Sequence, residues 1–137
     1  MRPEQGIIFF IMEQNIVGWF EIPVTDMARA RSFYESVLET QIRVMEMGDL
    51  TMGWFPMIPN SPGAPGALVK HAEFYFPSDS AGVLVYLSCP DVQVCLDRVE
   101  MAGGKVLQAK KQISEEYGYM GLLIDSEGNR IALHSRQ

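Results

Sequence analysis

Three side chains in this sequence have the chemistry for a metal site or for acid–base catalysis: Glu21, His71 and His134. Each lies in a segment whose residue pattern is typical of a β-strand. Imidazole exchanges protons near neutral pH, and both imidazole and carboxylate groups bind metal ions. If the fold brings the three together, they could hold a divalent cation or form an acid–base cluster. The alternative is a polar rim whose members hydrogen-bond to one another or to water.

Cys89 and Cys95 are the other reactive side chains. Their spacing matches no metal or redox motif. We therefore expect two free, buried thiols, one at the end of a strand and one inside the helix that follows. Free thiols are typical of a reducing compartment, and the predicted location is the cytoplasm. No nucleophile motif and no phosphate-binding glycine loop occurs in the sequence.

The composition is that of a single globular domain with a sizeable core. The chain has 137 residues, of which 47% are hydrophobic and 20% charged, and its formal net charge is −6. No basic cluster stands out beyond Lys110-Lys111, so we expect neither nucleic acid nor an anionic membrane surface as a partner.

An internal repeat positions the candidate residues. Residues 20–27 and 85–92 share one order, in which a strand ends, a proline follows and an aspartate, Asp26 or Asp91, opens a helix. A repeat of this length indicates two copies of one supersecondary unit. We assign residues 1–15 to an N-terminal extension and residues 16–137 to one domain, with units at 16–76 and 82–135.

Each unit is predicted to have the order β-α-β-β-β. The apolar faces of the two helices are expected to contain Met27, Ala30, Tyr34, Val37 and Leu38 in the first, and Val92, Cys95, Leu96, Val99 and Ala102 in the second. The expected strands are 16–22, 42–47, 50–56 and 66–74 in the first unit, and 83–88, 105–110, 117–124 and 130–135 in the second.

Three segments resemble the vicinal oxygen chelate superfamily, the glyoxalase, bleomycin-resistance and extradiol-dioxygenase proteins. They are Ile22–Met27 leading to Ser32-Phe33-Tyr34, then Ala102-Gly103-Gly104, then Ile124–Ile131, which is similar to the family's D-x-x-G-N hairpin. The resemblance covers residues 16–135. It implies an α+β fold in which two pseudo-symmetric βαβββ units form a curled, mixed-sheet cup. It also implies a homodimer.

The resemblance further implies where a metal would be bound. In the family's metal enzymes, four strand residues, usually His, Gln or Glu, point into the cup and hold one divalent cation. The corresponding positions here are Trp19, Leu84 and Ala132, with the fourth near Val69. None of these side chains is a ligand for a hard divalent ion. We therefore expect no metal and no cofactor at the usual place.

Residues two apart on a strand point to the same face of the sheet. The residues two positions beyond each of these four would therefore also face the cup. The predicted cavity lining is Trp19, Glu21, His71, Leu84, Tyr86, Ala132 and His134. Within this set Glu21, His71 and His134 could form a shifted metal site. Trp19 could either plug the cup or stack on a planar ligand.

Three functions remain open from the sequence. The first is a metal-independent protein that binds a small, partly apolar molecule in its cup. The second is a lyase, isomerase or dioxygenase that uses a shifted metal, or Glu21 with a histidine. The third is a dimeric interaction module whose contact includes the apolar run Ile7–Met12. That run could be an extra strand packed on a partner subunit, or Met12 could be the true start.

Overall fold

The structure is a computed structural model that describes residues 13–137. The predictions for Ile7–Met12 lie outside the described residues. The elements of the first unit are β1 (Phe20–Pro23), α1 (Met27–Leu38), β2 (Arg43–Met47), β3 (Leu50–Trp54) and β4 (Gly66–Lys70). Those of the second unit are β5 (Val85–Ser88), α2 (Val92–Val99), β6 (Lys105–Ser114), β7 (Gly118–Ile124) and β8 (Arg130–Ser135). The α+β fold of two βαβββ units is confirmed.

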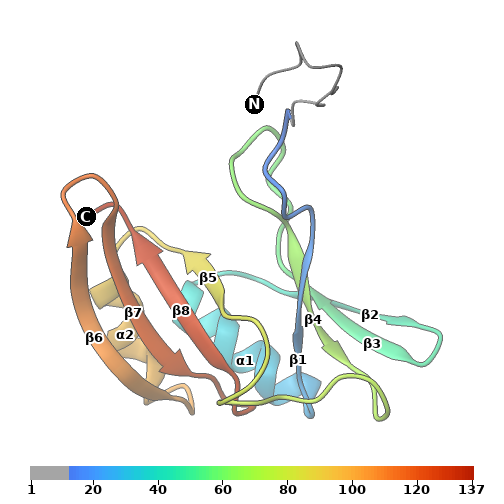
Figure 1. The fold of residues 1–137 in the computed structure, drawn as a ribbon. Coiled ribbons are helices and arrows are strands. Elements are labelled where there is room, and N and C mark those ends of the chain that lie inside the picture. The colour runs from blue at the N-terminus through green and yellow to red at the C-terminus, as the bar shows by residue number, and fades with distance from the viewer. Residues whose placement is uncertain (1–12) are drawn as a thin grey trace, which may run out of the picture.

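Each unit forms its own four-stranded mixed sheet, in the order β1-β4-β3-β2 and β5-β8-β7-β6 (Figure 1). β1 pairs in parallel with β4, and β5 pairs in parallel with β8, whereas the other neighbours are antiparallel. β1 and β5 are therefore edge strands. The two sheets are not joined to each other, so they do not close into one barrel.

Both helices begin where the sequence predicts, because an aspartate caps each of them. The side chain of Asp26 accepts a hydrogen bond from the backbone N–H of Arg29, and that of Asp91 accepts one from Gln93. Such caps satisfy N–H groups that have no partner inside the helix. Past the end of α2 the chain turns at Gly103, whose φ of 105° favours glycine.

One hydrophobic core serves both units. It contains the inward faces of α1 and α2, together with one face of each sheet; its largest fully buried side chains include Phe33, Tyr34, Ile22, Leu68, Leu123 and Leu133. The opposite face of the first sheet has a smaller cluster around Met52, Ala67 and Val69, packed against aromatic rings. That cluster contains no residue of the second unit within the described chain. The outward face of the first sheet therefore lies away from the shared core.

Three predicted strand boundaries were wrong by four residues, and the boundaries predicted at Pro56 and Val83 were wrong by two. β1 begins at Phe20 rather than Ile16, because its partner β4 is preceded by a proline-rich loop that forms no strand. β4 ends at Lys70 rather than Phe74, since residues 72–74 form a turn. β6 continues to Ser114, well beyond Lys110, by pairing with β7 through register shifts.

The turn between β7 and β8 connects the second unit to the first. Asp125 accepts a hydrogen bond of 2.6 Å from the hydroxyl of Tyr34, and Asn129 donates one of 2.7 Å to the carbonyl of Pro23. Glu127 accepts from the backbone N–H groups of Thr25 and Asp26, each at 2.8 Å, at the N-terminus of α1. The carboxylates of this turn therefore help to fix how the units pack.

Candidate functional site

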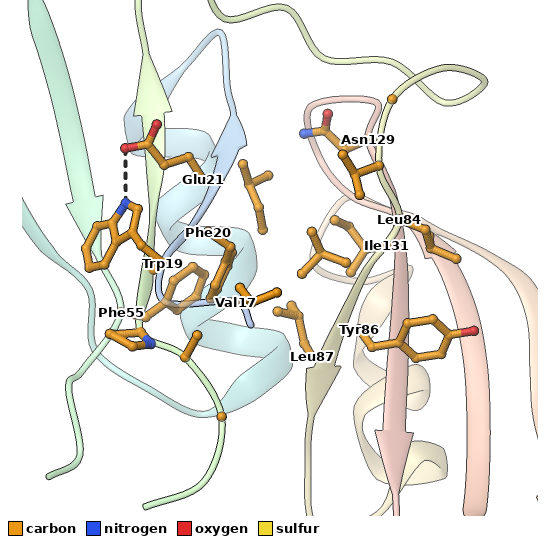
Figure 2. Close-up of a pocket in the computed structure, with 18 of the residues that line it drawn as sticks. Val17, Trp19, Phe20, Glu21, Phe55, Leu84, Tyr86, Leu87, Asn129 and Ile131 are labelled. Carbon is orange, nitrogen blue, oxygen red and sulfur yellow. Dashed lines mark hydrogen bonds between the residues drawn. The ribbon is translucent and has the colours of Figure 1, made fainter. Parts of the chain in front are cut away.

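A cleft of about 890 Å³ separates the edge strands β1 and β5. Its lining is mostly apolar and comes from both units, with Phe20 and Phe55 on one side and Leu84, Tyr86, Leu87 and Ile131 on the other. In Figure 2, Leu87 and Ile131 lie between the two sheets, opposite Phe20. The cleft exists because neither edge strand has a second neighbour that would fill the space between them.

Four of the seven predicted cavity residues line this cleft: Trp19, Glu21, Leu84 and Tyr86. Trp19 and Glu21 belong to the outward face of the first sheet, and Leu84 and Tyr86 to that of the second. Figure 2 shows that Trp19 and Glu21 point away from the gap, on the outward side of the first sheet, and that Tyr86 points away from it on the second sheet. The ring of Tyr86 is 52% exposed and lies on the outward side of the second sheet (Figure 2).

Glu21 is at the centre of an aromatic cluster on the outward face of the first sheet, which we call the Glu21 cluster (Trp19, Glu21, Trp54 and Tyr75). The indole N–H of Trp19 donates to Glu21 at 3.1 Å, and the hydroxyl of Tyr75 donates at 2.5 Å. The Trp19 and Trp54 rings meet edge to face, with centroids 4.9 Å apart. Both carboxylate oxygens of Glu21 thus accept a hydrogen bond from a neutral donor.

Tyr75 is a member of this cluster that our sequence analysis did not identify. The hydrogen bond that it donates to Glu21 raises the pKa of its phenol, and burial adds to the effect. Residue 75 continues the alternation of 67, 69 and 71, so the period-two pattern would have placed it on the same face as Glu21. The chain turns between β4 and Tyr75, and the hydroxyl nevertheless reaches the carboxylate.

Trp54 has a buried indole N–H with no hydrogen-bond partner within the described chain. Buried donors without partners are uncommon in folded proteins. This N–H belongs to the outward face of the first sheet, which packs against nothing from the second unit. One hydrogen-bond donor of the Glu21 cluster, the indole N–H of Trp54, therefore has no partner within residues 13–137.

The structure does not bring His71 and His134 to Glu21. His71 follows β4 in a turn, where its Nδ1 accepts the backbone N–H of Glu73 at 3.1 Å and its ring packs on Phe74. His134 lies on β8, and its Nε2 is 2.6 Å from the carbonyl oxygen of Tyr117. Neither histidine is among the residues that line the cleft.

The residues present do not fit a divalent metal at the positions implied by the resemblance. Val69 and Ala132 are fully buried, and neither they nor Trp19 and Leu84 carry a group that binds a hard cation. Across residues 13–137, no three His, Cys, Asp or Glu side chains lie close enough together to hold a metal ion. The shifted site of Glu21, His71 and His134 is not assembled within this part of one chain.

Both cysteines are free, as the sequence predicts: Cys95 is buried and Cys89 is half-buried. A hydrogen bond from the Cys89 thiol lowers the pKa of Cys95 to about 7, against the opposing effect of burial. The same bond and burial raise the pKa of Cys89. Cys89 also contacts the backbone carbonyl of His134 at 3.6 Å. Neither thiol lines the cleft.

Two βαβββ units with open mixed sheets and a cleft between their edge strands define a class of fold, and comparison with known proteins places the chain in it. Residues 16–133 match the family described as the Glyoxalase/Bleomycin resistance protein/Dioxygenase superfamily. The chain belongs to this superfamily, which confirms the resemblance seen in the sequence. No protein with a curated description matches the chain.

Several solved structures share the fold at low sequence identity. A glyoxylase/bleomycin resistance protein/dioxygenase domain from a Frankia species has a TM-score of 0.69 and 13% identity, covering 91% of this chain and 100% of that one. A glyoxalase/bleomycin resistance protein from Albidiferax ferrireducens has a TM-score of 0.66 and 15% identity, covering 90% and 100%. Glyoxalase I from Zea mays has a TM-score of 0.62 and 16% identity over 86% of this chain. This chain spans only 45% of that maize protein.

No helix within residues 13–137 is both long and apolar enough to cross a membrane.

Proposed function

We propose that this protein binds a small, partly apolar molecule in the cleft between β1 and β5. The observation that carries the proposal is the cleft of about 890 Å³, with apolar walls drawn from both units. Small-molecule sites usually have about 300–1,000 Å³, mainly apolar linings and a few convergent polar groups. Ser88 and Arg130 are among the polar residues of this lining. The free thiols fit the predicted cytoplasmic location.

Binding of the neutral, planar dye Nile red tests this function. We expect its fluorescence to rise on titration with the wild-type protein, and its Kd to increase about fivefold for Phe20→Ala, which removes an aromatic ring opposite Leu87 and Ile131. Tyr117→Ala is the matched control, because Tyr117 is 59% exposed and lies outside the cleft lining. Absence of binding to the wild-type protein, or an equal loss in both variants, would contradict the proposal.

We also propose that the protein forms a homodimer. The outward face of the first sheet carries partly buried Trp19, Trp54 and Met45 around a small apolar cluster, and nothing from the described part of the second unit covers it. Apolar faces of this kind are often covered by a second chain.

Sedimentation at micromolar concentration measures the dimer directly. We expect a mass of twice 15.4 kDa. Replacing the half-buried Met45 on this face by Glu should shift the population toward the monomer, because the change puts a charge into the contact. Val94→Glu on α2 is the control, since Val94 is 45% exposed and lies away from that face. A wild-type protein of monomeric mass would contradict the dimer.

A further inference from the structure

The edge of β1 that faces the cleft has backbone groups with no strand partner among residues 13–137. Successive residues of a strand direct their N–H and C=O groups to opposite sides. The N–H groups of Phe20 and Val24 donate to carbonyls on the β4 side, at 3.3 and 2.9 Å. The backbone of Trp19 and Glu21 is therefore directed to the other side, which explains why these residues line the cleft although their side chains point away from it.

The edge of β5, across the cleft, has the same character. The N–H of Cys89 donates to a carbonyl of β8 at 2.9 Å, so the backbone of Ser88 and Tyr86 is directed toward the cleft, and both residues line it. The side chains between the two edges are apolar and include Phe20, Leu87 and Ile131 (Figure 2). A groove with free strand edges and apolar walls suits an extended apolar segment of chain.

The free part of the β1 edge is the part nearest to the preceding chain. At the other end of β1, Pro23 has no N–H, and its carbonyl accepts the hydrogen bond from Asn129. Residues 13–18 lead into the free end, and the chain bends within them. Asn15 and Val17 themselves line the cleft. The chain that precedes Glu13 is therefore tethered at the cleft.

The sequence before Glu13 contains the apolar run Ile7–Met12. Its isoleucines and phenylalanines are residue types enriched in β-strands. Burial of such a run against apolar walls is favourable, because it removes apolar surface from water. The short link of residues 13–18 also gives the run a high effective concentration at this edge, which a separate peptide would lack.

We propose that Ile7–Met12 binds in the cleft as an added strand antiparallel to β1, and that a small-molecule ligand must displace it. The direction follows from the link, because a short connection joins antiparallel neighbours, whereas parallel ones need a long crossover. Pairing would satisfy the free backbone groups of Trp19 and Glu21, and alternate side chains of the run would meet the apolar walls. The displacement rests on the proposed small-molecule function; the added strand does not.

Amide hydrogen exchange, followed residue by residue by NMR, tests the pairing. We expect the Glu21 amide of the wild-type protein to exchange about tenfold more slowly than that of the double variant Ile8→Asp/Phe9→Asp. Neighbouring residues of a strand point to opposite faces, so one of the two charges meets the apolar walls in either register. The Phe20 amide, which donates to the β4 side, is the internal reference and should not change.

Val94→Asp/Met101→Asp is the matched control, because it puts the same two charges at exposed apolar residues outside the cleft lining. It should leave the exchange of Glu21 as in the wild type. A wild-type Glu21 amide that exchanges as fast as an unstructured one would overturn the added strand. Protection of Glu21 that rises with protein concentration would also overturn it, because the occupant would then come from a second copy.

Nile red separates this inference from the function on which its second half rests. We expect Ile8→Asp/Phe9→Asp to bind the dye about tenfold more tightly than the wild type, since its cleft is free. Equal affinity would overturn the displacement and leave small-molecule binding standing. No dye binding by either protein, with the Glu21 amide protected in the wild type, would overturn the function and the displacement but leave the added strand standing.

Discussion

Replacing Asp125 by Ala should lower the free energy of unfolding by about 3–5 kcal/mol, the largest loss that we expect from one side chain. Asp125 is only 3% exposed. It accepts hydrogen bonds from the Tyr34 hydroxyl, from the amide side chain of Asn129, and from the backbone N–H groups of Glu127 and Asn129. Alanine leaves all four donors without this partner, and each buried, unsatisfied group costs about 1–3 kcal/mol.

Urea unfolding followed by circular dichroism measures this loss. Asp79→Ala is the control, because Asp79 is exposed, and its variant should stay within about 0.5 kcal/mol of the wild type. Tyr34→Phe removes one of the four bonds and should cost about 1 kcal/mol. A loss below about 1 kcal/mol in Asp125→Ala would show that this network does not stabilise the fold.

The hydrogen bonds of Asp125 make the β7–β8 turn a structural contact between the two units. Asp125 and Glu127 belong to the segment that resembles the family's terminal hairpin, but neither of them lines the cleft. Burial, together with the charge of Asp125 and the bond to it, raises the pKa of Tyr34 well above its ordinary value. These groups are held by contacts between the units. Loss of binding in an Asp125 variant would therefore reflect loss of structure.

The helices could be predicted from sequence because the signals that define them are local. Asp26 and Asp91 cap helices within three residues of their own positions, and apolar spacing alone identified most of the buried faces. Phe33 was missed as a core residue, although it is fully buried. Phe33 directly precedes Tyr34 in α1. An apolar face wide enough to include both residues would have predicted the burial of Phe33.

The position at which a strand ends depends on the neighbouring strand with which it pairs, and the sequence does not show that neighbour directly. The pattern around His71 predicts a continuing strand, but the ring of His71 binds the backbone N–H of Glu73 and residues 72–74 turn away from the sheet. Side chains that bind nearby backbone groups compete with sheet pairing in this way. The predicted cluster of Glu21 with two histidines depended on that longer strand. The structure shows Glu21 bonded to Trp19 and Tyr75 instead.

The contacts between the units could not be predicted either. Glu127 was part of a recognised turn, yet its partners Thr25, Asp26 and Arg29 lie about a hundred positions earlier in the chain. No short-range pattern links them. Only the packing of α1 beside the β7–β8 turn brings the carboxylate to the N-terminus of that helix, where its negative charge is favourable.

Glu127→Gln should lower the free energy of unfolding by about 2 kcal/mol at neutral pH, and this loss should disappear in acid. Burial alone would raise the pKa of Glu127, but the hydrogen bond from Arg29 and those from the backbone of Asp26 and Thr25 outweigh it and lower the pKa to about 2. The Arg29 Nε lies 2.6 Å from Glu127 Oε2. Glutamine keeps one oxygen acceptor but loses the charge that attracts Arg29.

The sign of the pH effect follows from the lowered pKa. The unfolded chain binds a proton at Glu127 more readily, near its ordinary value of 4.5, so the stabilisation is complete above that pH and is lost as the pH falls toward about 2. The difference in unfolding free energy between wild type and Glu127→Gln should therefore shrink over this range. Glu115→Gln, at an exposed carboxylate, should show no such convergence. A difference that stays constant from pH 7 to 2 would mean that the charge of Glu127 does not stabilise the contact between the units.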